Sequence, residues 1–240
     1  MVDISVIIPA YKKGAVVEER VNNILTFLNE NKDINNFEII AVNDGSPDNT
    51  LEELSKFNFP EYTLINVDKN TGKGYALRQG FKKAKYSYVA FLDADNDLPL
   101  SNLEYLLKTI QNNSCDVVIC SKNHPNSLVK NPNRGLLSKC YFKFSNSLLK
   151  IPVSDSQVGA KIFKKEVLDS ITDKLCVNRF ATDIEILTAL NTKKYKIKEI
   201  PVELDIDGFE SSTVNVKEMA HMFVDTCAIA YRKYLKKWYD

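Results

Sequence analysis

The sequence predicts an α/β protein built around a mostly parallel sheet. In the first half of the chain, short apolar runs rich in β-branched and aromatic residues alternate with segments whose apolar residues recur at helical spacing. Such alternation is typical of βαβ units, whose strands lie parallel in one sheet. The runs are uniformly apolar, which predicts that both faces of the sheet are covered.

Composition excludes several classes of protein. The chain has 240 residues, of which 44% are hydrophobic and 26% charged, so it can form a core and is not disordered. Thirty-two Lys and Arg against 31 Asp and Glu give a net charge of +1, which argues against a nucleic-acid partner. The five cysteines lack CxxC spacing and predict neither a disulfide framework nor a zinc site. No apolar stretch approaches the roughly 20 residues that cross a bilayer, and the N-terminus resembles a buried strand, not a signal peptide.

The expected elements of the first half follow one another regularly. Strands of four to six residues are expected at 4–8, 37–42, 62–67, 88–92 and 117–120. Helices are expected between them, around residues 17–28, 51–54, 75–80 and 103–110. After residue 121 the pattern changes, and residues 122–133 (KNHPNSLVKNPN) predict a polar loop. Beyond it we expect helices at 135–149, 182–191 and 216–238 and strands at 160–163 and 197–204.

Polar residues cluster where the expected strands end. In an open α/β sheet, ligands bind at the carboxyl ends of the strands, near the point where strand order reverses. The segments at these ends are Pro9-Ala10-Tyr11, residues 43–46 (NDGS), residues 70–74 (NTGKG) and Asp93-Ala94-Asp95.

The carboxylates of Asp93 and Asp95 are the sharpest of these signals. Two acids separated by one residue at the end of a buried strand repel each other unless a cation lies between them. Mg²⁺ or Mn²⁺ prefers such oxygen ligands and would bridge them to phosphate oxygens. The alternative interpretation is a solvated turn.

The other strand ends suit a nucleotide. The glycines and Lys73 of NTGKG would let a helix N-terminus approach a phosphate, and Arg78 would add a cation. The segment matches neither a complete Walker A motif nor a dinucleotide fingerprint, and a plain strand-to-helix turn remains the alternative. Asp44 would bind a base or ribose, or form a helix cap or turn.

In this order and spacing, SVIIPAY, FEIIAVNDGSPDNT, NTGKGYALRQG and YVAFLDADNDLP resemble an inverting family-2 glycosyltransferase of the GT-A fold. Further on, SDSQVGAKIFKKEVL, RFATDIEIL and KEIPVEL resemble segments of the dolichyl-phosphate glucose and mannose synthase branch. The resemblance implies one GT-A domain over residues 1–240, with a nucleotide-sugar-binding half at 1–121 and an acceptor half at 122–240. One departure is that the acid usual after Tyr11 is missing, and Lys12-Lys13-Gly14 stands there.

The family also implies roles for particular residues. Pro9, Tyr11 and Asp44 would surround the base and ribose, and Asp93 and Asp95 would hold Mn²⁺ or Mg²⁺ on the diphosphate. The donor is expected to be a UDP-sugar in preference to a GDP-sugar, with glucose as the first candidate.

The acceptor decides what else the site needs. A hydroxyl of a glycan, a teichoic-acid-type polymer or a protein needs a general base, for which the resemblance makes Asp155 and Asp183 the candidates. A polyprenyl phosphate is already a nucleophile and needs cations, for which the resemblance suggests Arg134, Lys122, Lys161 and Arg179. We expect transfer to polyprenyl phosphate. The rivals are a hydroxyl acceptor and a non-catalytic nucleotide-sugar-binding protein.

The C-terminal segment bears on localisation. Residues 216–238 interleave apolar and aromatic residues with a basic cluster, as in a helix that lies in a membrane interface. The other interpretation is a helix docked on the core with a solvated basic end. We therefore expect a cytoplasmic protein, with peripheral binding to the cytoplasmic membrane face as the open alternative.

Overall fold

The computed structural model describes residues 1–112, 115–129, 136–204 and 216–240. One sheet organises the molecule, and its strands are β1 (Val2–Ala10), β2 (Ile34–Asp44), β3 (Tyr62–Val67), β4 (Tyr88–Leu92), β5 (Val117–Ser121), β7 (Ala160–Lys164) and β8 (Ile197–Pro201). Their spatial order is β3-β2-β1-β4-β7-β5-β8. β7 runs antiparallel to both of its neighbours, and the other pairs are parallel. The predicted mostly parallel sheet is therefore confirmed.

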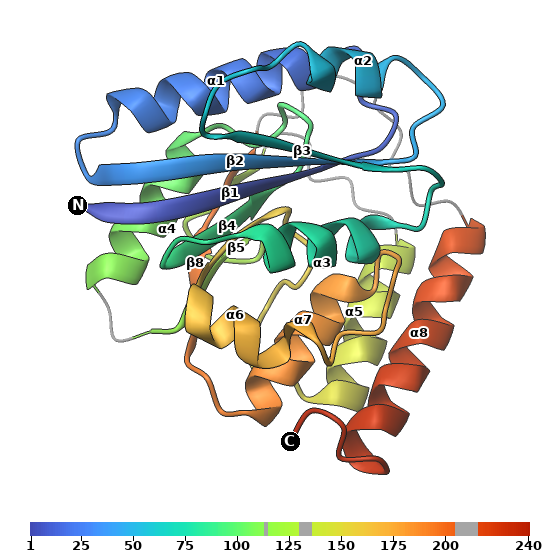
Figure 1. The fold of residues 1–240 in the computed structure, drawn as a ribbon. Coiled ribbons are helices and arrows are strands. Elements are labelled where there is room, and N and C mark those ends of the chain that lie inside the picture. Colours follow the sequence, from blue (N-terminus) through green and yellow to red (C-terminus); the bar gives the residue numbers. More distant parts are fainter. Residues whose placement is uncertain (113–114, 130–135, 205–215) are drawn as a thin grey trace.

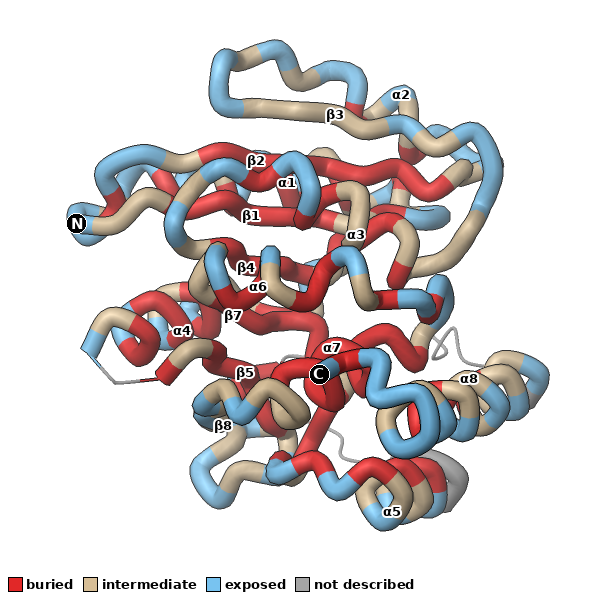
Figure 2. Tube along the Cα trace, turned by 60° about the horizontal axis from the view of Figure 1, so that its bottom comes forward, coloured by how far each residue is buried: buried red, intermediate tan, exposed pale blue. Residues whose placement is uncertain are grey.

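Helices cover both faces of this sheet (Figure 1). They are α1 (Val17–Glu30), α2 (Thr50–Ser55), α3 (Lys73–Lys83), α4 (Ser101–Asn112), α5 (Leu136–Leu149), α6 (Lys165–Thr172), α7 (Thr182–Thr192) and α8 (Val216–Tyr234). Side chains of β1 alternate between two cores: Val6 and Ile8 pack with α1 and α4, and Ile7 packs with α3, α6 and α7. The strands at the centre of the sheet are buried along most of their length, as Figure 2 shows.

Several elements differ from the sequence-based expectation, among them α6, which was not expected. The segment expected to be a loop contains β6 (Leu128–Val129), which pairs with β9 (Glu203–Leu204) in a second small sheet. The single strand expected at 197–204 is thus two strands, β8 and β9, in different sheets. The last helix ends at Tyr234 because the tail turns back through Lys237, at φ 48°, and buries Tyr239.

The topology decides where polar strand ends can meet. The chain runs outward from β1 through β2 to β3, and then returns through α3 to β4 on the other side of β1. Strand order therefore reverses at β1. The carboxyl ends of β1, β2 and β4 lie next to one another there, beside the start of α3.

Candidate active site

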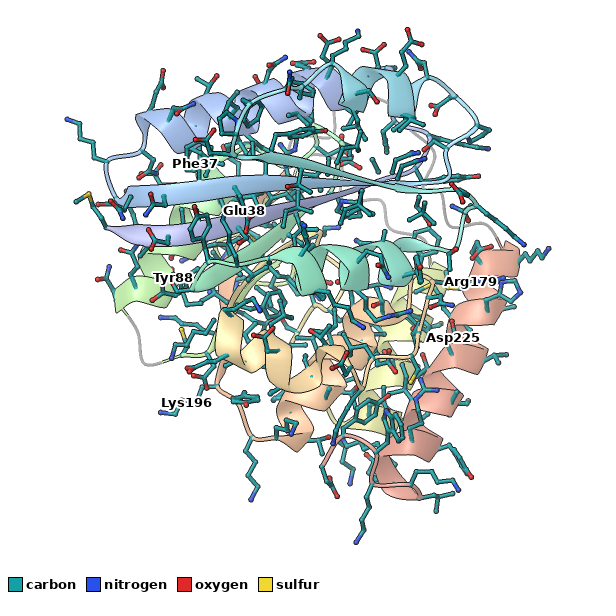
Figure 3. All side chains as sticks on the ribbon, in the orientation of Figure 1. Phe37, Glu38, Tyr88, Arg179, Lys196 and Asp225 are labelled. Carbon is teal, nitrogen blue, oxygen red and sulfur yellow. The ribbon has the colours of Figure 1, made fainter. Side chains whose placement is uncertain are left out.

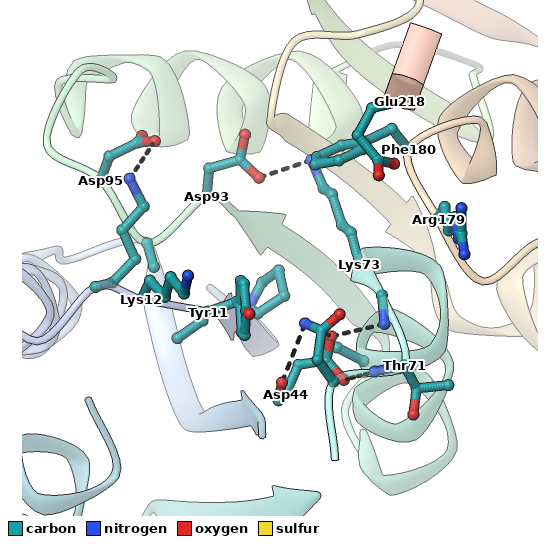
Figure 4. Close-up of a pocket in the computed structure, with 17 residues that line it drawn as sticks. Tyr11, Lys12, Asp44, Thr71, Lys73, Asp93, Asp95, Arg179, Phe180 and Glu218 are labelled. Carbon is teal, nitrogen blue, oxygen red and sulfur yellow. Dashed lines mark hydrogen bonds and ion pairs between the residues drawn. The ribbon is translucent and has the colours of Figure 1, made fainter. Parts of the chain in front are cut away.

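A pocket of about 860 Å³ opens at this reversal point (Figure 4). The ends of β1, β2 and β4 form it together with the start of α3, the segment before α7 and the first turn of α8. Its lining comprises Pro9, Ala10, Tyr11, Lys12, Lys13, Asp44, Asn70, Thr71, Gly72, Lys73, Ala76, Asp93, Ala94, Asp95, Arg179, Phe180 and Glu218. Residues from all four strand-end segments selected from the sequence thus share one cavity.

Asp93 is held in place by its backbone and by a glycine. Its amide donates to the carbonyl of Gly159 at 2.9 Å. A Cβ added at position 159 would lie 1.7 Å from an Asp93 carboxylate oxygen. Only glycine leaves room for the carboxylate where it stands, so Gly159 is a positioning residue for Asp93.

Each acid of the Asp93-Ala94-Asp95 segment is paired with a lysine from a different strand end (Figure 4). Lys73 Nζ lies 2.8 Å from Asp93 Oδ1, and Lys13 Nζ lies 3.6 Å from Asp95 Oδ2. Lys73 opens α3, and Lys13 lies in the loop after β1. The two carboxylates of this segment are therefore each neutralised by an ammonium group of the pocket.

A buried ion-pair network supports this arrangement from below. Asp183, at the start of α7, lies 3.7 Å from Lys73 Nζ and 2.6 Å from Lys161 Nζ. Lys161 has no exposed surface and also donates to the Val158 carbonyl at 2.7 Å. The ring of Phe91 lies 5.0 Å from the Lys161 ammonium and 5.5 Å from that of Lys73. Lys161 is thus enclosed in the core, where it fixes Asp183.

The charges shift the pKa values of the two pocket acids in opposite directions. Burial acts to raise the pKa of Asp93, but Lys73, with Lys161 and Lys122, outweighs it and holds that pKa below its ordinary value. Burial and the neighbouring Asp93 raise the pKa of Asp95, although Lys13 acts against them. Burial acts to lower the pKa of Lys73, but Asp93 and Asp183 raise it above its ordinary value. Lys73 is therefore a permanent cation.

The donor set of the pocket fits a hard divalent cation that arrives with its own ligands. Asp93 and Asp95 offer carboxylate oxygens, the ligand type of Mg²⁺ and Mn²⁺. Among the described residues, no group of three or more His, Cys, Asp or Glu side chains could hold a metal by itself. Mg²⁺ sites completed by substrate phosphates commonly have one or two protein carboxylates, so the residues fit such a site.

Asp44 organises the loop that faces the end of β1. Its carboxylate accepts hydrogen bonds from the amides of Thr71 and Gly72 at 2.9 and 2.7 Å, and from the Asn70 side chain at 3.0 Å. Gly72 has a φ of 110°, which favours glycine. Asp44 both lines the pocket and holds the NTGKG segment against it.

The segment before α7 closes over the start of α3. The Asn178 carbonyl accepts the amides of Gly74 and Tyr75 at 2.7 and 3.2 Å, so these first-turn donors bond within the protein. Arg78 points away from the pocket lining: its Nη1 donates to the Val177 carbonyl at 2.6 Å, and its Nη2 contacts the Asn178 side chain.

Glu185 anchors that same segment to the C-terminus. Its side chain is fully buried, and Oε2 accepts the amides of Cys176 and Val177 at 2.9 and 2.7 Å. Oε1 accepts from Arg232 Nη2 at 2.9 Å and from the Tyr239 hydroxyl at 2.7 Å. One carboxylate thus links α7, α8 and the pocket wall.

The residues expected at the acceptor side are dispersed. Arg179 lines the pocket and contacts His221 of α8, with Asp225 one turn further along that helix (Figure 3). Asp155 is buried and accepts the amides of Lys122 and Gln157 at 3.2 and 3.0 Å.

Of the remaining acceptor candidates, Lys122 is close enough to Asp93 to lower its pKa. Arg134 lies outside the described residues. Neither Asp155 nor Asp183 is among the described residues that line the pocket.

Sequence reasoning missed several residues that build the site. Lys13 was noted only in a departure from the family pattern, and Gly159 and Glu185 only as parts of likenesses. Arg20 of α1 is 2% exposed, and its Nη1 donates to the Leu98 carbonyl at 2.9 Å. Its Nε and Nη2 have no hydrogen-bond partner in the described structure. Burial lowers the pKa of Arg20, and the nearby carboxylates of Asp95 and Asp93 act against that shift. The sequence signal for Arg20 was an arginine at a position of an amphipathic helix that faces the core.

Comparisons with known proteins agree with this geometry. The family model described as "Glycosyl transferase family 2" matches residues 5–172. The chain is 30% identical over 227 residues to a dolichyl-phosphate beta-glucosyltransferase of Saccharomyces cerevisiae, covering 85% of this chain and 68% of that protein. It is 28% identical over 239 residues to the Dictyostelium discoideum protein of the same name, covering 91% and 73%.

Solved structures show the same fold. Glucosyl-3-phosphoglycerate synthase from Mycobacterium tuberculosis, in complex with Mn²⁺, UDP-glucose and phosphoglyceric acid, superposes with a TM-score of 0.74 at 17% identity. The match covers 97% of this chain and 79% of that one. The GT-A fold expected from the sequence is thereby confirmed.

Proposed function

Because the chain belongs to glycosyl transferase family 2, we propose that it transfers glucose from UDP-glucose to a polyprenyl phosphate with inversion of the sugar anomer. The relatives named above as dolichyl-phosphate beta-glucosyltransferases support both the sugar and the acceptor class. The UDP-glucose complex of the structural neighbour supports the donor.

The residues at the strand ends would bind the donor. Pro9, Tyr11 and Asp44 would surround the base and ribose, and Asp93 and Asp95 would hold Mn²⁺ or Mg²⁺. The metal supplies charge stabilisation to the leaving diphosphate. Sugar transfer passes through an oxocarbenium-like state with positive charge on the ring, which the surrounding carboxylates favour.

The burial of Asp155 and Asp183 is the observation that favours a phosphate acceptor. A hydroxyl acceptor needs a carboxylate base within hydrogen-bond reach of its proton. Asp183 is 3% exposed and is held by lysines, and Asp155 is 4% exposed and is held by amides. A phosphate is already anionic and needs no base, only cations such as Arg179 and Lys122 beside the pocket. Asp183 then acts as a support for Lys73.

The test is release of nucleoside diphosphate by the purified protein with Mn²⁺ and a panel of UDP- and GDP-sugars, each with and without a short-chain polyprenyl phosphate. We expect release from UDP-glucose that requires the lipid phosphate and that yields a glucosyl lipid. Release that ignores the lipid would direct the acceptor search to glycan and protein hydroxyls. Binding of the donor without release under any condition would indicate a non-catalytic protein.

We further propose that the protein works peripherally on the cytoplasmic face of a membrane, where polyprenyl phosphate meets nucleotide sugars. No helix in the described parts of the chain has the length and apolar character to span a bilayer. α8 nevertheless presents an outward stripe of apolar residues, namely Ala220, Val224, Cys227, Tyr231, Tyr234 and Leu235. Of these, Val224 is 67% exposed and Leu235 74% exposed.

An anionic bilayer is the occupant that this stripe fits. Lys236, Lys237 and Trp238 follow it and are exposed, so cations and an aromatic ring stand beside apolar surface, as in interfacial helices. The first turn of α8 lines the pocket through Glu218. The stripe runs along another face of the same helix to the basic end, so a bilayer bound by this stripe would lie against an element that also lines the pocket.

Binding to phosphatidylserine-containing vesicles tests this proposal by flotation. We expect the double variant Lys236→Gln/Lys237→Gln to bind about 30-fold more weakly, since each lysine near an anionic surface contributes about 1 kcal/mol. The matched control is Lys82→Gln/Lys83→Gln, an adjacent exposed pair at the end of α3, which should bind normally. If the wild-type protein does not bind the vesicles, the membrane proposal is wrong and the stripe binds another partner.

A further inference from the structure

The two lysine–carboxylate pairs of the pocket differ from the buried pair beneath them. In the outer pairs the side chains of Lys73 and Asp93 are 16% and 30% exposed, and those of Lys13 and Asp95 are 20% and 29% exposed. In the pair below, the exposures are 0% for Lys161 and 4% for Asp183. The outer pairs can therefore be separated by a ligand that enters the pocket, whereas the inner pair is fixed.

We propose that Lys13 and Lys73 are exchangeable counter-ions: they hold Asp95 and Asp93 against a bare divalent cation and turn to the diphosphate when metal and nucleotide bind together. This inference rests on the proposed function, because it concerns the same donor site. Lysine suits the exchange because its ammonium is a point charge on a flexible stem with three donors. No bond to carbon or phosphorus changes in this step.

Charge balance supports the exchange. Two carboxylates and two ammonium groups sum to zero, so a lone Mn²⁺ would leave the set with two uncompensated positive charges. When Mn²⁺ arrives with the diphosphate of a nucleotide sugar, the two negative charges of the diphosphate balance the two positive charges of the ion. The set of side chains and ligand then stays neutral. At separations near 4 Å such charges interact strongly even at an effective dielectric constant of about 20. The site therefore favours the metal–nucleotide complex over the free ion.

Lys13 and Lys73 would also stabilise the negative charge of the leaving UDP. Breaking the bond between glucose and the diphosphate adds one negative charge to UDP. Ammonium groups that have moved to the diphosphate lie where that charge develops. Lys13 also lies two residues after Tyr11, in the Lys12-Lys13-Gly14 segment that stands where the family usually carries an acid. A cation in place of an acid alters the affinity for a bare metal in the sense proposed.

The test compares Mn²⁺ affinity without nucleotide, from the electron paramagnetic resonance signal of free Mn²⁺, with UDP affinity at saturating Mn²⁺, from calorimetry. For Lys13→Met we expect Mn²⁺ alone to bind about tenfold more tightly, because a repelling cation is gone, and UDP to bind at least about tenfold more weakly. Opposite signs in the two measurements separate exchange from a general loss of structure, which would weaken both.

Two variants serve as controls. Lys13→Arg keeps the charge and should retain the weak binding of Mn²⁺ alone. Lys69→Met removes an exposed cation that does not line the pocket, and should change the Mn²⁺ affinity by less than about twofold. Unchanged or weaker binding of Mn²⁺ alone by Lys13→Met overturns the exchange. Failure of the wild-type protein to bind UDP with Mn²⁺ contradicts the proposed function instead, and the metal measurement still decides the role of Lys13.

Discussion

Asp95→Asn is expected to reduce glucosyl transfer by about three orders of magnitude at saturating donor, while the protein stays folded. The amide keeps the size of the side chain but removes the charge proposed to hold the metal. Stabilisation of the leaving diphosphate by a metal is worth several kcal/mol, and each 1.36 kcal/mol is about tenfold in rate. The measurement is UDP release at a range of Mn²⁺ concentrations.

The matched control for this variant is Asp33→Asn. Asp33 is exposed and precedes β2, at the opposite edge of the sheet from the pocket. The control should transfer glucose at the wild-type rate and melt at the wild-type temperature. If Asp95→Asn retains more than about a tenth of the activity at every Mn²⁺ concentration, Asp95 is not a metal ligand in this protein.

Glu185→Ala is expected to destabilise the fold by about 3–5 kcal/mol, because it leaves Arg232 without its buried partner and orphans two amides. For a chain of this size that corresponds to a fall in Tm of about 6–20 °C. Nucleotide binding in the pocket should also weaken, since the segment that Glu185 holds carries Asn178 and Arg179. Thermal unfolding followed by circular dichroism measures the first effect, and UDP binding with Mn²⁺ at low temperature measures the second.

Glu52→Gln provides the comparison. Glu52 also lies in the first turn of a helix, α2, but is exposed, so it loses the same favourable helix-dipole interaction without breaking a buried network. Its Tm should fall by about 2–4 °C at most. Equal losses in Glu185→Ala and Glu52→Gln would contradict the structural role assigned to Glu185.

The strand-end residues that share the pocket were predictable from local sequence. Pro9, Tyr11, Asp44 and the Asp93-Ala94-Asp95 segment lie at or directly after the carboxyl end of a strand, so the position of the strand places each residue. Apolar periodicity identifies the strands, and parallel topology places their carboxyl ends along one edge. The same logic predicted the sheet, and the resemblance of the ordered motifs to known members indicated the family.

The partners of the basic side chains were not predictable in this way. Arg78 was expected beside a donor phosphate and Lys161 beside the acceptor, but Lys161 is enclosed beside Asp183 and Arg78 fixes the loop before α7. A lysine or arginine gives the same sequence signal whether its side chain binds a substrate or a buried carboxylate. Which of the two occurs depends on packing between segments far apart in the chain.

By itself the sequence determined the α/β class, the strand-end residues and the family, because all of these follow from periodicity and from motifs within single segments. Only the tertiary structure decided which charges are partners. It alone paired Lys13 with Asp95, Lys73 with Asp93 and Glu185 with Arg232. Ion pairing depends on distances of a few ångströms between separate elements, and spacing along one chain does not encode those distances.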